Sequence, residues 1–217
     1  MYKTVVFDLD GTLLNTLTDL ADAGNRLCRK YGWPTHERQA YRYFVGNGIP
    51  KLVERLTPAD QRTPAVLEVA LADFKRDYGQ HLRDTTAPYP GIPEMLAKLK
   101  ANGVQLAVFS NKADALAKEV VKDYFGTQYF TIVRGQMTGV APKPAAEGTN
   151  ALLQALHADP ASTLYVGDSN VDVETAHNAN LPCCGAVWGF RTREELNAAG
   201  AEYLAENSDE LYDVIMK

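Results

Sequence analysis

Short apolar runs alternate with amphipathic helical segments over most of the chain, and this alternation predicts parallel βαβ units. The first run, Thr4–Phe7, has the composition of a strand buried on both faces of a sheet. After residue 91 the same pattern returns several times. Strands are expected at 4–7, 105–109, 129–133, 163–166 and 185–188, and helices at 92–101, at 113–124, around 152–156 and from about residue 170.

A long segment after the first strand interrupts this alternation and contains only helical patterns. Residues 17–31 place their apolar side chains on one helical face, and Gly32 is suited to end that helix. Further breaks are expected at Gly46–Gly48 and at Thr57–Pro64. No strand is expected from residue 16 to residue 89.

Together these patterns predict an α/β fold with a doubly wound, Rossmann-like parallel sheet and an inserted all-helical domain. We expect the α/β core over residues 1–15 plus 90–217 and the helical insert over residues 16–89.

The composition is that of a folded globular protein, with 46% hydrophobic and 23% charged residues among 217. The net charge of -5 provides no basic field, so nucleic acid is not expected as a partner. No apolar run approaches the roughly 20 residues that span a bilayer. The three cysteines, Cys28, Cys183 and Cys184, form no disulfide framework or zinc spacing, which favours a cytoplasmic location.

Polar residues end three of the expected strands, at Asp8, Ser110 and Asp168. In doubly wound sheets, ligands bind beyond the carboxyl ends of the strands. Asp8 and Asp10 are two residues apart, and Gly11 allows the chain to turn so that the two carboxylates converge. Such a pair serves to bind a divalent metal or to supply a nucleophile and an acid/base. The same residues would also occur in an ordinary aspartate-rich turn without a catalytic or metal-binding role.

Two more clusters add chemistry but also have structural explanations. Asp168 is followed by Ser169 and Asp172, which are either metal-site residues or the cap and first-turn charge of a helix. Lys143 lies between two prolines, which restrict its backbone, and it is either a cation for the acidic strand ends or a solvated loop lysine.

The ordered set of these clusters resembles the haloacid dehalogenase superfamily. The residues that carry the resemblance are the segments Asp8–Leu13 and Gly167–Asp172 together with Ser110 and Lys143. The helical insert is similar to the four-helix type of cap in that superfamily, so the resemblance covers the whole chain.

The resemblance implies a role for each of these residues. Asp8 is the expected nucleophile and forms an aspartyl phosphate, and Asp10 is the expected general acid/base. Mg²⁺ is expected on Asp8, Asp168 and the backbone carbonyl of Asp10, with Asp172 supporting the site or binding through water. Ser110 and Lys143 complete the implied catalytic set. Contacts to substrate are expected from Gly11, Thr12, Asn111, Gly48 and Lys51.

The acid at position 10 favours phosphate over carbon–halogen chemistry, because dehalogenases of the superfamily lack it. The segments Phe44–Gly48 and Phe109–Lys112 look most similar to the phosphoglycolate phosphatase group. Lys112 is either a substrate contact or a surface lysine in the first turn of a helix. Members of the superfamily usually carry an acid and a serine where this chain has Asn15 and Thr16. The sequence does not tell whether these exchanges alter the orientation of the cap or the affinity for the metal.

We therefore expect a Mg²⁺-dependent phosphatase of small phosphate monoesters, with 2-phosphoglycolate foremost. The alternatives within the same superfamily are a pyrophosphatase and a β-phosphoglucomutase-like phosphotransferase, which share many of the same sequence features. A non-catalytic interaction protein is the third possibility, although every expected catalytic group is present. The expected partner is a small phosphorylated metabolite, and the expected state is a monomer or homodimer.

Overall fold

The computed structural model describes residues 1–217, and these form two compact units, each described by itself. The first, here the core unit, comprises Met1–Leu14 and Pro88–Lys217. The second, here the helical unit, is Asn15–Ala87. The expected domain boundaries, after residues 15 and 89, lie one to two residues from these divisions.

The core unit contains a six-stranded sheet in the order β5-β4-β1-β6-β7-β8, in which all pairings are parallel. The doubly wound parallel sheet is thus confirmed. Its strands are β1 Thr4–Phe7, β4 Gln105–Ala113, β5 Phe130–Gln136, β6 Thr163–Gly167, β7 Cys183–Ala186 and β8 Tyr203–Ala205.

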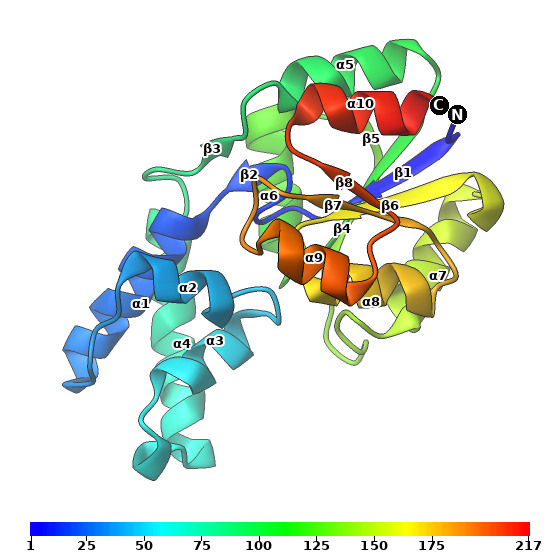
Figure 1. Ribbon diagram of the computed structural model, residues 1–217. Helices are drawn as coiled ribbons and strands as arrows, with labels where there is room; N and C mark the ends of the chain where they lie inside the picture. Colours follow the sequence, from blue (N-terminus) through cyan, green and yellow to red (C-terminus); the bar gives the residue numbers. More distant parts are fainter. The chain divides into compact units, whose positions relative to one another are not determined.

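Helices cover both faces of this sheet (Figure 1). On one face α5 packs against α10, and on the other α7 and α9 both pack against α8. The helices are α5 Ile92–Ala101, α6 Asp114–Phe125, α7 Ala146–Leu156, α8 Asn170–Asn178, α9 Arg193–Ala199 and α10 Ser208–Met216. None of the helices in the structure has the length and hydropathy needed to cross a membrane.

Strand β1 is the centre of the sheet and explains where a ligand would bind. Its Val5, Val6 and Phe7 are fully buried, as expected for a strand with helices on both sides. The chain leaves β1 toward β4 and β5 and later returns to its other side at β6. The strand order therefore reverses at β1, and the carboxyl end of β1 is the usual ligand position in such a sheet.

The helical unit contains four α-helices and one 3-10 turn. They are α1 Leu17–Tyr31, α2 Arg38–Phe44, α3 Ile49–Leu56, η1 Ala59–Gln61 and α4 Pro64–His81. Helix α1 ends at Gly32 in the left-handed conformation, and α4 begins at the N-cap Thr63, whose side chain accepts a hydrogen bond from the Val66 backbone. Within this unit, Asp19 accepts hydrogen bonds from the backbone N–H groups and hydroxyls of Thr85 and Thr86.

Several expectations about strands were wrong, among them the end of β4, which runs past Ser110 to Ala113. Strands β2, Leu14–Asn15, and β3, Ala87–Pro88, form a two-stranded ribbon that is too short to leave a sequence pattern. Strand β7 includes Cys183 and Cys184 instead of following them, and β8 was not anticipated. Both cysteines are buried free thiols.

Candidate active site

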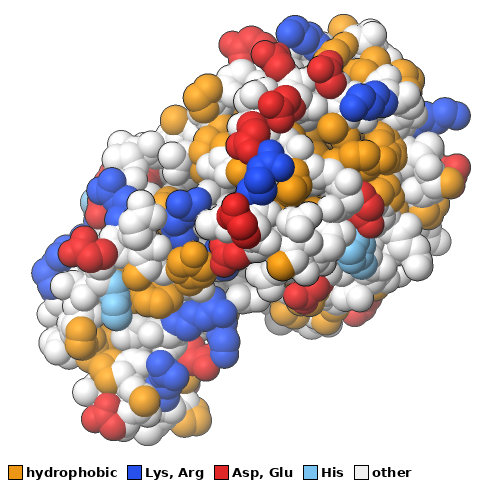
Figure 2. All heavy atoms as spheres, in the orientation of Figure 1, with side chains coloured by type: hydrophobic (Ala, Val, Ile, Leu, Met, Phe, Trp, Pro, Cys, Tyr) orange, Lys and Arg blue, Asp and Glu red, His pale blue; other side chains and the backbone are white.

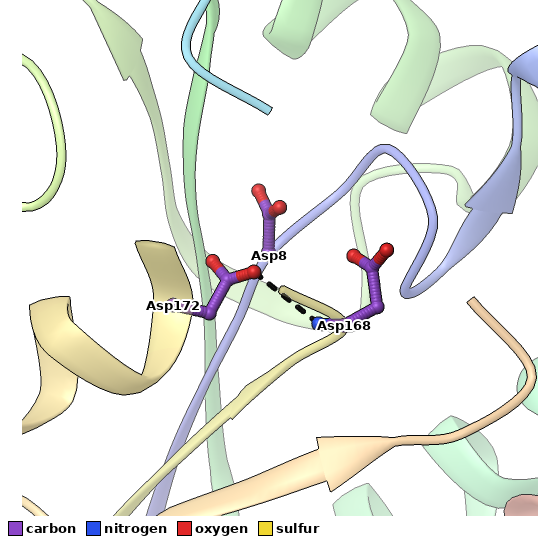
Figure 3. Close-up of side chains that lie close together, drawn as sticks. All are labelled: Asp8, Asp168 and Asp172. Atoms are coloured by element: carbon purple, nitrogen blue, oxygen red, sulfur yellow. Dashed lines mark hydrogen bonds between the residues drawn. The ribbon is translucent and has the colours of Figure 1, made fainter. Parts of the chain in front are cut away.

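Three acidic residues converge at the carboxyl end of β1 and β6 (Figure 3). Asp8 follows β1, Asp168 follows β6, and Asp172 lies in the first turn of α8. One carboxylate oxygen from each lies within 4.8 Å of the others, and all three residues are buried. Because like charges repel strongly when they are buried together, this cluster requires a cation or a proton.

Lys143 supplies one of the required cations. Its Nζ lies 2.9 Å from Oδ1 of Asp8 and 2.7 Å from Oδ1 of Asp172, and its side chain is 1% exposed. Burial alone would lower the pKa of this lysine, but the charges of Asp172 and Asp8 raise it well above its ordinary value. The two carboxylates therefore stabilise the charged form of the lysine, which lies between them. The loop that carries Lys143 belongs to the site, and the solvated-lysine interpretation does not apply to it.

Both carboxylate oxygens of Asp172 contact neighbouring groups of the cluster. Its Oδ2 accepts hydrogen bonds from the backbone N–H groups of Asp168 and Ser169 and from the Ser169 hydroxyl, while Oδ1 faces Lys143. Ser169 and Asp172 thereby form the capping box of α8. The helix-capping interpretation of this cluster is confirmed, and the same bonds fix the backbone of Asp168. The metal-site interpretation stays a prediction.

Asp168 is fixed by the loop after β1 and by the segment after β7. Its Oδ1 accepts a hydrogen bond from the Thr12 hydroxyl at 3.0 Å, and its Oδ2 accepts one from the Phe190 backbone at 2.7 Å. Gly11 has a φ of 91°, and a Cβ on it would lie 2.3 Å from Asp168 Oδ2. Burial, followed by the charges of Asp172 and Asp8, raises the pKa of Asp168 well above its ordinary value.

Asp8 has the properties of a metal-binding oxygen donor. Burial raises the pKa of its carboxyl to about 7, although the charge of Lys143 opposes this shift. Its Oδ1 is buried and has no partner in hydrogen-bond geometry, even though the Lys143 ammonium lies within ion-pair distance. A buried anionic oxygen with no hydrogen bond, close to a second carboxylate on Asp168, suits a hard divalent cation such as Mg²⁺. The residues present therefore fit the expected ion.

Asp10 and Ser110 lie beside this cluster, together with a lysine whose place the sequence left open. Both oxygens of Asp10 contact Nζ of Lys112, at 3.1 and 3.3 Å. Lys112 belongs to β4 and is buried, so it is not a surface lysine of the following helix. The Ser110 hydroxyl accepts a hydrogen bond from the Lys112 backbone N–H at 3.3 Å and is also buried.

The predicted substrate contacts occupy different environments. Gly11 and Thr12 lie against Asp168, and the Asn111 side chain bonds to the backbone of Lys143. Gly48 and Lys51 belong to the helical unit, where Gly48 is the N-cap of α3 and Lys51 pairs with Glu54 at 2.8 Å. Contact of these five residues with substrate stays a prediction.

Tyr165 is a site residue that the sequence analysis missed. It lies within β6, and its hydroxyl is 3.2 Å from Nζ of Lys143. Its run of apolar neighbours suggested only a core strand. A fully buried tyrosine hydroxyl nevertheless needs a polar partner, and that requirement was the available signal.

Comparison with known proteins identifies relatives over the whole chain. A family model described as haloacid dehalogenase-like hydrolase matches residues 5–186. A phosphoglycolate phosphatase of Chromobacterium violaceum is 31% identical over 216 residues, covering 98% of this chain and 96% of the relative. One of Thiobacillus denitrificans is 31% identical over 191 residues, covering 87% and 84%.

Solved structures agree with this result. The crystal structure of a Lactobacillus delbrueckii subsp. bulgaricus protein, provisionally named phosphoglycolate phosphatase, superposes with a TM-score of 0.93 at 28% identity. The alignment covers 99% of this chain and 98% of that one.

Proposed function

The chain belongs to the family of haloacid dehalogenase-like hydrolases and is a phosphatase, and from this premise we propose that it hydrolyses small phosphate monoesters through an aspartyl phosphate on Asp8. The observation that carries the proposal is the environment of Asp8. Its buried carboxylate lies between the Lys143 ammonium and the carboxylate of Asp168, at the reversal point of the sheet.

The first step transfers the phosphoryl group to the protein. A carboxylate oxygen of Asp8 attacks phosphorus, the bond from phosphorus to the ester oxygen breaks, and Asp10 donates a proton to the departing alcohol. Lys143 offsets the repulsion between the attacking carboxylate and the phosphate, and Ser110 binds a phosphoryl oxygen through its hydroxyl. Phosphoryl transfer depends mainly on such positioning and charge stabilisation.

The second step regenerates Asp8. Asp10 accepts a proton from water, the water oxygen attacks phosphorus, and the bond from phosphorus to the Asp8 oxygen breaks to release inorganic phosphate. Asp8 and Asp168, with the backbone carbonyl of Asp10, would hold Mg²⁺. When bound, Mg²⁺ neutralises negative charge on the phosphoryl oxygens.

We propose 2-phosphoglycolate as the foremost substrate, since the relatives named above are phosphoglycolate phosphatases. Surface charge supports a small-molecule substrate, because acidic and basic side chains are interspersed on the face shown in Figure 2 instead of forming one basic field. The buried free cysteines support a reducing, cytoplasmic setting. We expect a monomer or a homodimer.

A phosphate-release assay tests the function. The purified chain with Mg²⁺ is expected to release phosphate from 2-phosphoglycolate faster than from pyrophosphate, sugar phosphates and nucleotides. Asp8→Asn is expected to abolish release from every substrate, whereas Asp213→Asn, an exchange of the same type at an exposed position of α10, is expected to retain it. Full activity of Asp8→Asn would contradict the covalent mechanism, and faster release from another compound would replace the substrate.

A further inference from the structure

Lys112 is a buried cation for which the mechanism above has no use. Its side chain is 3% exposed, and its Nζ lies 3.1 Å from one oxygen of Asp10 and 3.3 Å from the other. The Asp10 side chain is itself 20% exposed, so its carboxyl group remains accessible while the lysine contacts both of its oxygens. Burying a lysine costs several kcal/mol unless it is paired, so this contact is a specific one.

The backbone of Lys112 is held in place by an irregularity in the sheet. In the pairing of β4 with β5, Phe109 lies opposite Arg134 and Ala113 lies opposite Gln136. Four steps along β4 therefore correspond to two along β5, and the additional residues form a bulge. Bulges redirect side chains that a regular strand would send to alternate faces.

Gly135 on β5 makes room for this bulge. A Cβ on Gly135 would lie 2.4 Å from the backbone oxygen of Lys112, which is closer than any side chain could be tolerated. The Gly135 N–H donates to Oδ1 of Asp114 at 3.0 Å, directly after the bulge. The lysine that contacts Asp10 therefore extends from a segment fixed by the sheet.

Asp10, by contrast, lies in the loop after β1, next to Gly11. A carboxylate that must face the leaving oxygen in one step and water in the next has to be held in a narrow range of orientations. The two-oxygen contact with Lys112 restricts the direction in which the Asp10 carboxylate points, because both oxygens must stay close to the same ammonium.

We propose that Lys112 is a positioning residue that holds the Asp10 carboxylate in the orientation needed to transfer protons to the leaving oxygen and from water. The proposal rests on the proposed function, since it acts through Asp10. It assigns to the two buried lysines of the site separate tasks. Lys143 lies with the nucleophile Asp8, and Lys112 lies with the acid/base Asp10.

The test compares two substrates that differ mainly in how much their leaving group needs a proton. Phenolate, the leaving group of phenyl phosphate, is a poor leaving group, so its departure depends on protonation. 4-Nitrophenolate, the leaving group of 4-nitrophenyl phosphate, departs with little need for a proton. In Lys112→Met, kcat/KM for phenyl phosphate is expected to fall at least about 10-fold more than kcat/KM for 4-nitrophenyl phosphate, a loss within the usual range of acid catalysis. A loss of general structure would lower both values equally.

A double-mutant cycle tests whether the effect passes through Asp10. In Asp10→Asn the orientation of residue 10 no longer matters for proton transfer, so adding Lys112→Met is expected to change kcat/KM for phenyl phosphate less than 2-fold or so. Lys112→Arg keeps a cation for both oxygens and is expected to retain most of the leaving-group dependence. Lys122→Met, at an exposed position of α6, is the matched control and is expected to leave kcat/KM for both substrates unchanged.

If Lys112→Met does not fold, Lys112→Gln replaces it and carries the same expectations. Equal losses for the two phosphates, additive losses in the double mutant, or unchanged kinetics would each overturn the positioning role. A rise in KM confined to 2-phosphoglycolate would overturn it as well, by assigning Lys112 to the substrate carboxylate. Absence of Asp8-dependent hydrolysis in the unaltered chain would instead overturn the proposed function.

Discussion

The side chain of Asn111 hydrogen-bonds to both the backbone N–H and the backbone carbonyl of Lys143. Oδ1 of Asn111 accepts a hydrogen bond from the Lys143 N–H at 2.9 Å, and Nδ2 donates to the Lys143 carbonyl at 3.2 Å. An amide side chain thus pairs with the loop as a neighbouring strand would. The loop that carries the central cation of the site is in this way attached to β4.

Asn111→Asp is expected to break half of this attachment. The carboxylate still accepts from the Lys143 N–H, but it faces the Lys143 carbonyl with a second acceptor instead of a donor. We expect the free energy of unfolding to fall by about 1–3 kcal/mol, the usual cost of an unsatisfied buried group, and kcat to fall as the ammonium shifts. Urea unfolding and steady-state kinetics measure the two effects.

Asn178→Asp is a suitable control for that variant. Asn178 also bonds the loop, through Nδ2 to the Pro144 carbonyl at 2.8 Å, but it is exposed. Its exchange is expected to change stability by less than about 0.5 kcal/mol. Equal effects of the two exchanges would show that the attachment by Asn111 has no special importance.

The pKa shifts in the acidic cluster predict how stability depends on pH and Mg²⁺. Burial raises the pKa of Asp8 to about 7 and raises that of Asp168, so the folded metal-free chain keeps protons that the unfolded chain has already released. The free energy of unfolding without metal is therefore expected to fall as the pH rises from about 4 to about 7.

Mg²⁺ is expected to reverse this loss, because it favours the ionised carboxylates. Thermal unfolding in EDTA and in Mg²⁺ is the measurement, and the stabilisation by Mg²⁺ is expected to be larger near pH 8 than near pH 5. Asp8→Asn removes one titrating group and is expected to flatten the metal-free pH dependence. An equal gain from Mg²⁺ at both pH values would contradict the assignment.

Gly189 provides a test of how closely the segment after β7 packs on Asp168. A Cβ at this position would lie 2.2 Å from the Asp168 Cβ and 2.5 Å from the Gly11 carbonyl oxygen. Gly189→Ala is therefore expected to lower the free energy of unfolding by about 1–3 kcal/mol and to weaken Mg²⁺ binding. Calorimetric titration with Mg²⁺ and urea unfolding measure these changes.

The control for Gly189 is Gly79 in α4. A Cβ there would meet nothing within 4 Å, and alanine is the better helix former. Gly79→Ala is expected to stabilise the chain by about 0.5–1 kcal/mol. If Gly189→Ala proved as harmless as this control, the close packing on Asp168 would be refuted.

The sequence predicted the sheet and the acidic residues because both leave local signals. Buried parallel strands such as β1 are apolar runs, and Asp8 and Asp168 come directly after such runs. Strand β8 was missed because it has only three residues, of which one is exposed and one partly exposed. The ribbon of β2 and β3 is too short for any periodicity.

The contacts that hold the site together were less accessible to sequence analysis. The placement of Lys112 depends on a bulge and on Gly135 in another strand, and neither can be read from the residues around position 112. Asn111 was expected as a substrate contact, and nothing near it in the sequence indicates its hydrogen bonds to a loop 32 positions further along the chain. Such pairings between distant segments arise only when the sheet has formed.

The β2–β3 ribbon has a consequence for how this kind of chain can diversify. Entry into residues 15–87 and exit from them occur on paired strands, so the excursion begins and ends at one place. A segment with adjacent ends can be lengthened, shortened or exchanged without stretching the polypeptide on either side of it. Evolution can therefore vary the insert as a replaceable module while the catalytic scaffold keeps its architecture.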